Sequence, residues 1–74
     1  MKRYKKLRLL FVEREVTQNY VAQQIGMGTS TMSARMSGAQ PWTSWEIIRI
    51  GELLGIPPEE YHRYFFEKAA GARS

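Results

Sequence analysis

The sequence predicts an all-α fold, a compact five-helix bundle in which two central helices meet at a tight turn. Three features lead to this prediction: apolar residues recur every three or four positions in separate segments, glycine or proline lies between those segments, and the chain has 74 residues. A chain of this length forms one small core, so residues 1–74 are interpreted as a single domain. Because the sequence contains no cysteine, neither a disulfide framework nor a thiolate metal site is expected.

The first expected helix covers residues 4–14 and is amphipathic. Leu7, Leu10 and Phe11 share its inward face, and charged residues occupy the remaining surface. This spacing predicts that the first helix covers one side of the core.

Positive charge is concentrated in the first half of the chain. Residues 1–40 carry seven Lys or Arg and two Glu, a net charge of +5, whereas residues 41–74 carry four Lys or Arg and five Glu, a net charge of −1. Such a field favours a polyanionic partner, and Lys5 and Lys6 are expected to supply diffuse attraction to phosphate. The simpler alternative is a solvated basic N-terminus that keeps the protein soluble.

Residues 17–38 (TQNYVAQQIGMGTSTMSARMSG) predict two helices, over 18–24 and 29–36, joined by a sharp corner. Thr17 is the expected N-cap of the first of them. Gly26 is expected to end that helix in the left-handed backbone conformation. The apolar positions that pack the two helices are Val21, Ala22, Ile25, Met32 and Met36.

Two further helices are expected, over 44–54 and 58–68. Gly51, in the middle of the first of these, indicates a close crossing with a neighbouring helix rather than a break. Trp42 and Trp45 are expected to cover the core rather than to stack with bases.

The last helix carries more aromatic residues than one face can bury. Tyr61, Tyr64, Phe65 and Phe66 fall within six residues, so Phe66, with Tyr64 beside it, is expected to lie outside the core and to form a dimer interface. The alternative dimer surface is Trp42 or Trp45. Residues 69–74 are expected to form a loose tail.

The segment 17–38 resembles the helix-turn-helix of the lambdoid phage repressors and Cro proteins, and WTSWEIIRIGELLGIPPEEYHRYFF resembles the fourth and fifth helices of small Cro-like proteins. The residues that carry the first resemblance are Thr17, Gln18, Val21, Ala22, Ile25, Gly26, Ser30, Thr31, Met32 and Gly38. The sequence departs from the family at Gly28, which stands where a Ser or Thr cap is usual. It also departs at Phe11 and Met36, which replace an Arg–Glu ion pair by two apolar residues and predict a direct contact between them.

The resemblance implies a double-stranded DNA partner and assigns roles to residues. The side chains expected to read bases are Thr29, Ser30, Ser33 and Ala34. The side chains expected to contact phosphate are Thr17, Gln18, Lys5, Lys6, Arg35 and Gln40. Since the base-reading side chains are short, part of the specificity is expected to come from DNA shape.

The function implied is a phage or prophage transcriptional regulator, a repressor that blocks a promoter as a homodimer, in the cytoplasm of a bacterial host and associated with the nucleoid. The alternatives are an antitoxin-type regulator and a helical protein-interaction adaptor that does not bind DNA. No enzyme activity, cofactor, metal or small-molecule substrate is expected, because one histidine and no cysteine or aspartate leave little from which to build a catalytic site. A membrane location is not expected either, because no apolar run approaches the roughly 20 residues that cross a bilayer.

Overall fold

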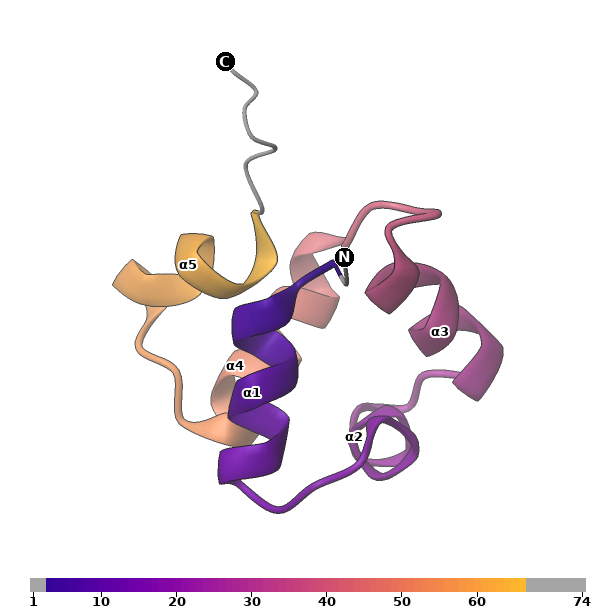
Figure 1. Ribbon diagram of the computed structural model, residues 1–74, viewed down its shortest axis with the longest axis horizontal. Coiled ribbons are helices and arrows are strands. Elements are labelled where there is room, and N and C mark those ends of the chain that lie inside the picture. The colour runs from indigo at the N-terminus through magenta and orange to yellow at the C-terminus, as the bar shows by residue number, and fades with distance from the viewer. Residues whose placement is uncertain (1–2, 67–74) are drawn as a thin grey trace.

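The computed structural model describes residues 3–66, and all of its regular structure is helical (Figure 1). The elements are α1 (Lys5–Glu13), α2 (Gln18–Ile25), α3 (Thr29–Ser37), α4 (Ser44–Leu54), a 3₁₀ turn η1 (Pro58–Glu60) and α5 (Tyr61–Phe65). The described residues contain no strand, so the predicted all-α class with five α-helices is confirmed. Helix α2 packs against α3 and α4, while α5 packs against α1 and α4. Figure 1 shows α2 and α3 on one side of α1 and α5 on the other.

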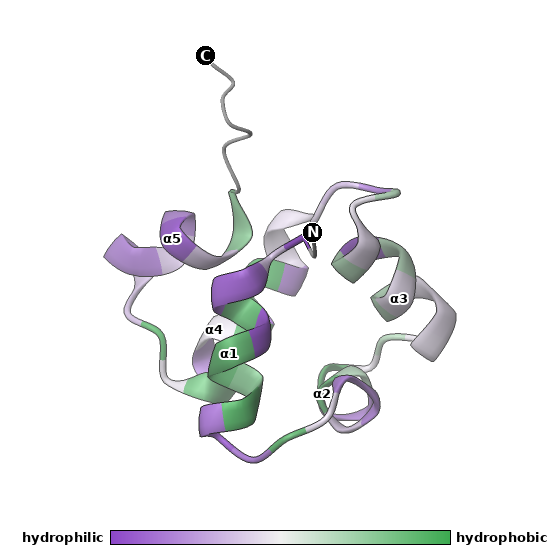
Figure 2. Ribbon diagram, viewed as in Figure 1, coloured by the Kyte–Doolittle hydropathy of each residue, from purple (hydrophilic) through white to green (hydrophobic). Residues whose placement is uncertain are grey.

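One hydrophobic core joins all five helices. Its members are Tyr4, Leu7, Leu10, Phe11, Val21, Ala22, Ile25, Met27, Met32, Met36, Ile47, Ile50, Leu54, Ile56 and Phe65. In Figure 2 the hydrophobic side of α2 turns toward the middle of the bundle and its hydrophilic side turns away. Burying a large aliphatic side chain contributes about 1.5–3 kcal/mol. Helices this short are marginal in isolation, so this packing, more than helix propensity, stabilises them.

The corner between α2 and α3 forms as the sequence predicts. The Thr17 hydroxyl accepts a hydrogen bond from the Tyr20 amide at 3.0 Å, which caps α2. Gly26 ends α2 with φ of 76°, and the Met27 amide then donates to the Ala22 carbonyl at 2.8 Å. Because a β-carbon is costly at this backbone angle, glycine suits the corner.

Two arginines of the first helical region hydrogen-bond the C-terminal ends of other helices. The Arg8 guanidinium donates to the Met36 carbonyl of α3 at 3.0 Å, and the Arg14 guanidinium donates to the Leu54 carbonyl of α4 at 3.1 Å. The last carbonyls of a helix have no partner within the helix, and cations are favoured at that end. Both arginines therefore link α3 and α4 to the α1 region. The sequence pattern predicted only that the charged residues of the first helix lie on its surface.

The last helix differs from the prediction over 58–68. Its first turn is the 3₁₀ turn η1, closed by a 2.8 Å hydrogen bond from the Glu60 amide to the Pro57 carbonyl, and α5 ends at Phe65. Phe66 has non-helical backbone angles, φ −115° and ψ 75°. Phe65 is the last buried residue of the described chain, so packing does not support the helix beyond it. Residues 67–68 of the predicted helix and the predicted tail over 69–74 lie outside the described residues.

The two tryptophans behave differently. Trp42 packs edge-on against Tyr4 and Phe65, with ring centroids 6.0 and 5.3 Å away, and covers the core as predicted. Trp45 is exposed, so its predicted place in the core was wrong. The reason is rotational: two residues correspond to about 200° around a helix, so Trp45 points away from the side on which Ile47 is buried.

Helix α4 runs through Gly51 without a break, and the ring of Tyr61 from α5 lies against it. A β-carbon at Gly51 would overlap that ring. The predicted close crossing is therefore confirmed, and α5 is the helix that crosses.

Candidate nucleic-acid interface

Helix α3 presents a polar surface on one side and is anchored on the other. Met32 and Met36 are each only 1% exposed and hold the helix on the core. Thr29, Ser30 and Ser33 are exposed, whereas Ala34, the fourth residue predicted to read bases, is half-buried. The structure therefore places three short hydroxyl side chains on the outer surface of α3.

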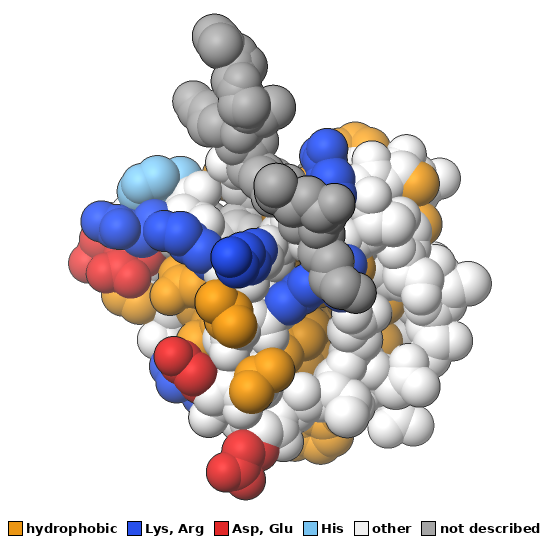
Figure 3. Space-filling model, in the orientation of Figure 1, with side chains coloured by type: hydrophobic (Ala, Val, Ile, Leu, Met, Phe, Trp, Pro, Cys, Tyr) orange, Lys and Arg blue, Asp and Glu red, His pale blue; other side chains and the backbone are white. Residues whose placement is uncertain are grey.

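The lysine and arginine side chains are unevenly distributed over the face of the molecule shown in Figure 3. On the face shown in Figure 3 they lie mainly over α1 and α5, while the part over α2 and α3 carries little charge. Lys5 and Lys6 are exposed on α1, and Lys6 lines a shallow groove with Tyr64 of α5. The structure thus groups Lys6 with a residue of the predicted dimer interface rather than with the predicted base-reading residues.

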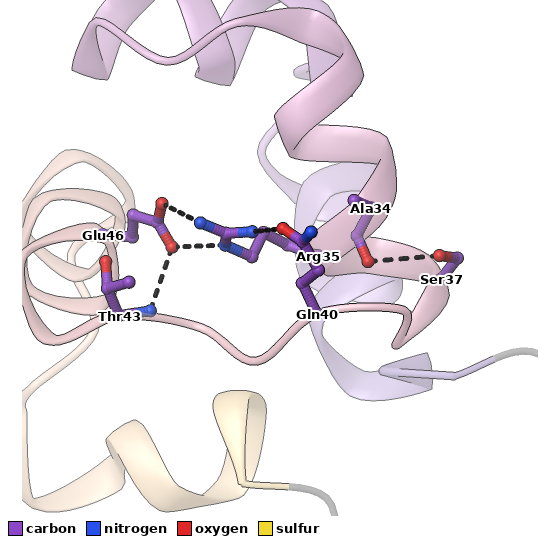
Figure 4. A network of polar contacts seen from close by, with 6 residues as sticks. All are labelled: Ala34, Arg35, Ser37, Gln40, Thr43 and Glu46. Atoms are coloured by element: carbon purple, nitrogen blue, oxygen red, sulfur yellow. Dashed lines mark hydrogen bonds and ion pairs between the residues drawn. The ribbon is translucent and has the colours of Figure 1, made fainter.

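Arg35 and Gln40, two residues predicted to contact phosphate, are joined to each other and to α4 (Figure 4). The Arg35 guanidinium donates to the two carboxylate oxygens of Glu46, from Nε at 2.8 Å and from Nη2 at 3.0 Å. Its Nη1 donates to Gln40 Oε1 at 2.6 Å. The Thr43 amide donates to Glu46 Oε1 at 3.0 Å as part of a capping box at the start of α4. One carboxylate therefore links the end of α3 to the beginning of α4.

The Arg35–Glu46 pair is shielded from solvent, with side chains 12% and 2% exposed. Burial on its own would raise the pKa of Glu46, but hydrogen bonds from Arg35 and Thr43 outweigh it and hold that pKa below its usual value. The same hydrogen bond raises the pKa of Arg35. Both groups are thus charged in the folded protein at neutral pH, and each compensates the burial of the other.

The start of α2 provides a second polar region. Thr17 is exposed and uses its hydroxyl as a helix cap. Gln18 is half-buried and lines a shallow depression of about 360 Å³ with Arg8, Phe11, Val12 and Val16. The two residues lie at the N-terminus of a helix, where backbone amides and the helix dipole favour an anion.

The predicted dimer residues lie at the end of α5. Phe66 is 58% exposed and so lies outside the core, as the crowding of aromatics predicted. Tyr64 is half-buried and packs against the core cluster. Their role in a dimer stays a prediction.

The link between Arg35 and Glu46 was missed at the level of sequence. Arg35 was expected only as a phosphate contact, and Glu46 was assigned no role in the candidate site. The available signal was a pair of opposite charges on the two sides of a short loop. The two residues lie eleven positions apart, and helix periodicity does not predict contacts across a loop. Phe11 and Met36 are both buried in the core cluster, and their direct contact stays a prediction.

Comparison of the sequence with known protein families identifies the family of this chain. The family described as "Protein of unknown function (DUF739)" matches residues 2–68. The chain belongs to this family. The DUF739 match covers every described helix, so the corner and the Arg35–Glu46 pair both lie within it. No curated protein matches the chain.

Residues 3–66 of this DUF739 chain contain neither a membrane-spanning helix nor a cluster of metal ligands. None of the helices in that range is long and apolar enough to cross a membrane. That range also contains no group of three or more acidic or histidine side chains placed to hold a metal ion.

Proposed function

We propose that the protein binds double-stranded DNA in a sequence-specific manner and regulates transcription, acting as a homodimeric repressor that blocks a promoter. The observation that carries the proposal is the construction of α3. Met32 and Met36 hold one side on the core, Gly26 sets the angle at which the helix leaves α2, and the opposite side exposes Thr29, Ser30 and Ser33. A short helix presented in this way fits the major groove.

In this proposal the exposed hydroxyls of α3 contact base edges, and the Ala34 methyl group lies against a thymine methyl. Hydroxyl groups bond to several bases, so each position discriminates modestly and DNA shape supplies further specificity.

Phosphate contacts are proposed at the start of α2 and just after the end of α3. The start of α2, with Thr17 and Gln18, offers amide and helix-dipole attraction. Gln40 uses its side-chain oxygen for Arg35, which directs its amide NH₂ group outward as a phosphate donor. Arg35 then serves DNA binding by orienting Gln40, while Lys5 and Lys6 add diffuse attraction.

Dimerisation is proposed through Phe66 and Tyr64. One domain reads a short half-site, and two domains are needed to contact half-sites about one DNA turn, roughly 34–36 Å, apart. The proposed setting is the bacterial cytoplasm, in association with the nucleoid.

The test is selection of duplexes from a random pool, followed by titration of the selected duplex at several salt concentrations. Enrichment of a two-half-site sequence is expected, with affinity that falls as salt rises. Neutralising Lys5 should lower the salt slope by up to about 1. A folded protein that enriches no duplex and shows no salt-sensitive DNA binding would refute the proposal. In that case the protein-interaction adaptor becomes the better explanation.

A further inference from the structure

Helix α1 carries an exposed hydrophobic strip that the core does not use. Leu9 is 53% exposed and Val12 is 72% exposed. They are three residues apart, so they lie on neighbouring turns of one side of the helix. Beside them runs a groove of about 180 Å³, lined by Lys6, Leu9, Leu10, Glu13 and Tyr64. The strip and the groove form one surface, the α1 face, defined by Lys6, Leu9, Val12, Glu13 and Tyr64.

Charges at the two ends of the α1 face have opposite signs. Lys5 and Lys6 lie in the first turn of α1, and Glu13 is its last residue. Figure 3 shows the same order over α1, with basic side chains at one end, hydrophobic side chains in the middle and acidic side chains at the other end. A surface with this pattern is complementary to a copy of itself turned end over end.

The charge order is unfavourable for α1 as an isolated helix. The first turn contains no acidic residue and the last turn contains no basic residue. A helix dipole favours the reverse, with acids at the N-terminus and bases at the C-terminus. The stability of α1 within one molecule therefore does not account for Lys6 and Glu13 in these places. Attraction to DNA would account for Lys6 alone, whereas pairing with a second molecule accounts for both residues.

We propose that the α1 face is the surface on which a second copy of this chain docks, with the two α1 helices antiparallel and a twofold axis near Leu9. In this arrangement Leu9 and Val12 pack against their counterparts, and Lys6 faces Glu13 of the partner subunit twice, once on each side of the axis. The inference rests on the homodimer in the proposed function and extends its interface from Tyr64 of α5 to α1.

A second exposed hydrophobic pair, Trp45 and Ile48 on α4, provides the matched control. Ile48 is 47% exposed, close to the value for Leu9. Aspartate at either position introduces the same charge at a similar level of exposure. Only the Leu9 change lies on the α1 face.

The experiment is sedimentation equilibrium of the full chain without DNA, with circular dichroism to check folding. Leu9→Asp is expected to weaken dimerisation at least about tenfold, and Ile48→Asp to leave it unchanged. If Ile48→Asp dissociates the dimer and Leu9→Asp does not, or if the chain is a monomer at all concentrations, the inference is wrong. Because DNA is absent, these outcomes do not test base recognition by α3, although a monomer at all concentrations would also contradict the homodimer of the proposed function. A failed duplex selection leaves the dimer result standing.

Charge reversal provides a second test that keeps the hydrophobic strip intact. Lys6→Glu and Glu13→Lys each place like charges together twice in the dimer, so each alone is expected to weaken dimerisation about tenfold, and the double variant to restore it. Each single change also gives α1 the charge its dipole favours, so the dilute monomer is expected to melt at a higher temperature. Loss of dimerisation together with a more stable monomer supports an interface. Single reversals that leave dimerisation unchanged, or a double variant that fails to restore it, would overturn the proposed pairing.

Discussion

The two ends of α3 are constructed in opposite ways. At its N-terminal end, Gly28 is the N-cap and makes no side-chain capping bond, and Thr29 and Ser30 are exposed. At its C-terminal end, Arg35 is bonded to Glu46, and the Met36 carbonyl accepts a hydrogen bond from Arg8. One end is held by α1 and α4, and the other has polar side chains available to a partner. The difference suggests that the proposed recognition helix is positioned from its C-terminal end.

The largest expected effect comes from removing Glu46. Glu46→Ala leaves the Arg35 guanidinium shielded without its counter-charge, and loss of one partner from a buried pair costs about 3–5 kcal/mol. Urea unfolding of the variant should show this loss. The double variant Arg35→Met, Glu46→Leu removes both charges and should recover much of it. A single Glu46→Ala loss below about 1 kcal/mol, the range of an exposed ion pair, would show that the C-terminal end of α3 is not fixed in this way.

Acid should weaken the same end of α3. The folded-state pKa of Glu46 is lowered, so the carboxylate contributes stability that is fully present above its unfolded pKa of about 4.3. That contribution is lost as the pH falls from there through the folded pKa. Comparing urea midpoints at neutral pH and below pH about 4 should show a smaller decrease in Glu46→Gln than in the natural chain. Equal decreases in the two proteins would argue against Glu46 as the titrating group.

Glycine substitutions should separate the corner before α3 from the C-terminal end of α3 by a smaller margin. Gly26 and Gly38 have φ of 76° and 84°, so alanine at either position should cost about 1–2 kcal/mol from backbone strain. A β-carbon at Gly26 would have no neighbouring atom within 4 Å, whereas a β-carbon at Gly38 would overlap the Arg3 side chain. Because the overlapping atoms belong to the far end of a flexible arginine side chain, Gly38→Ala should be only slightly the more destabilising in thermal melts. Equal losses in the two variants would mean that the Arg3 side chain moves aside without cost.

The smallest effect on stability is expected at the exposed end. Thr29→Ala and Ser30→Ala remove no buried contact, so each should change the free energy of unfolding by no more than about 0.5 kcal/mol. In the proposed complex each should change base preference at its own position by about 1–3 kcal/mol. Competition titrations with duplexes altered at one base pair would measure this. Unchanged preference in both variants would show that α3 does not dock through this end.

Features set by neighbouring residues were predictable from the sequence. Thr17 caps α2, Gly26 turns the chain, and Met32 and Met36 fall on one side of α3 because capping, left-handed glycine and helical periodicity act within a few residues. The exposure of Phe66 was also predictable, because one helix face cannot bury four aromatic side chains that lie within six residues.

Features set by contacts between distant segments were decided only by the tertiary structure. The partner of Arg35 depends on how the loop brings α4 beside α3. The carbonyl groups to which Arg8 and Arg14 donate depend on which helix termini lie near α1. Trp45 faces solvent, and α5 stops at Phe65, because burial depends on where the other helices lie. Local sequence determined where helices begin and turn, since those preferences act over one or two turns. Packing determined which charges meet and which aromatic rings are covered, since those contacts exist only after the chain has folded.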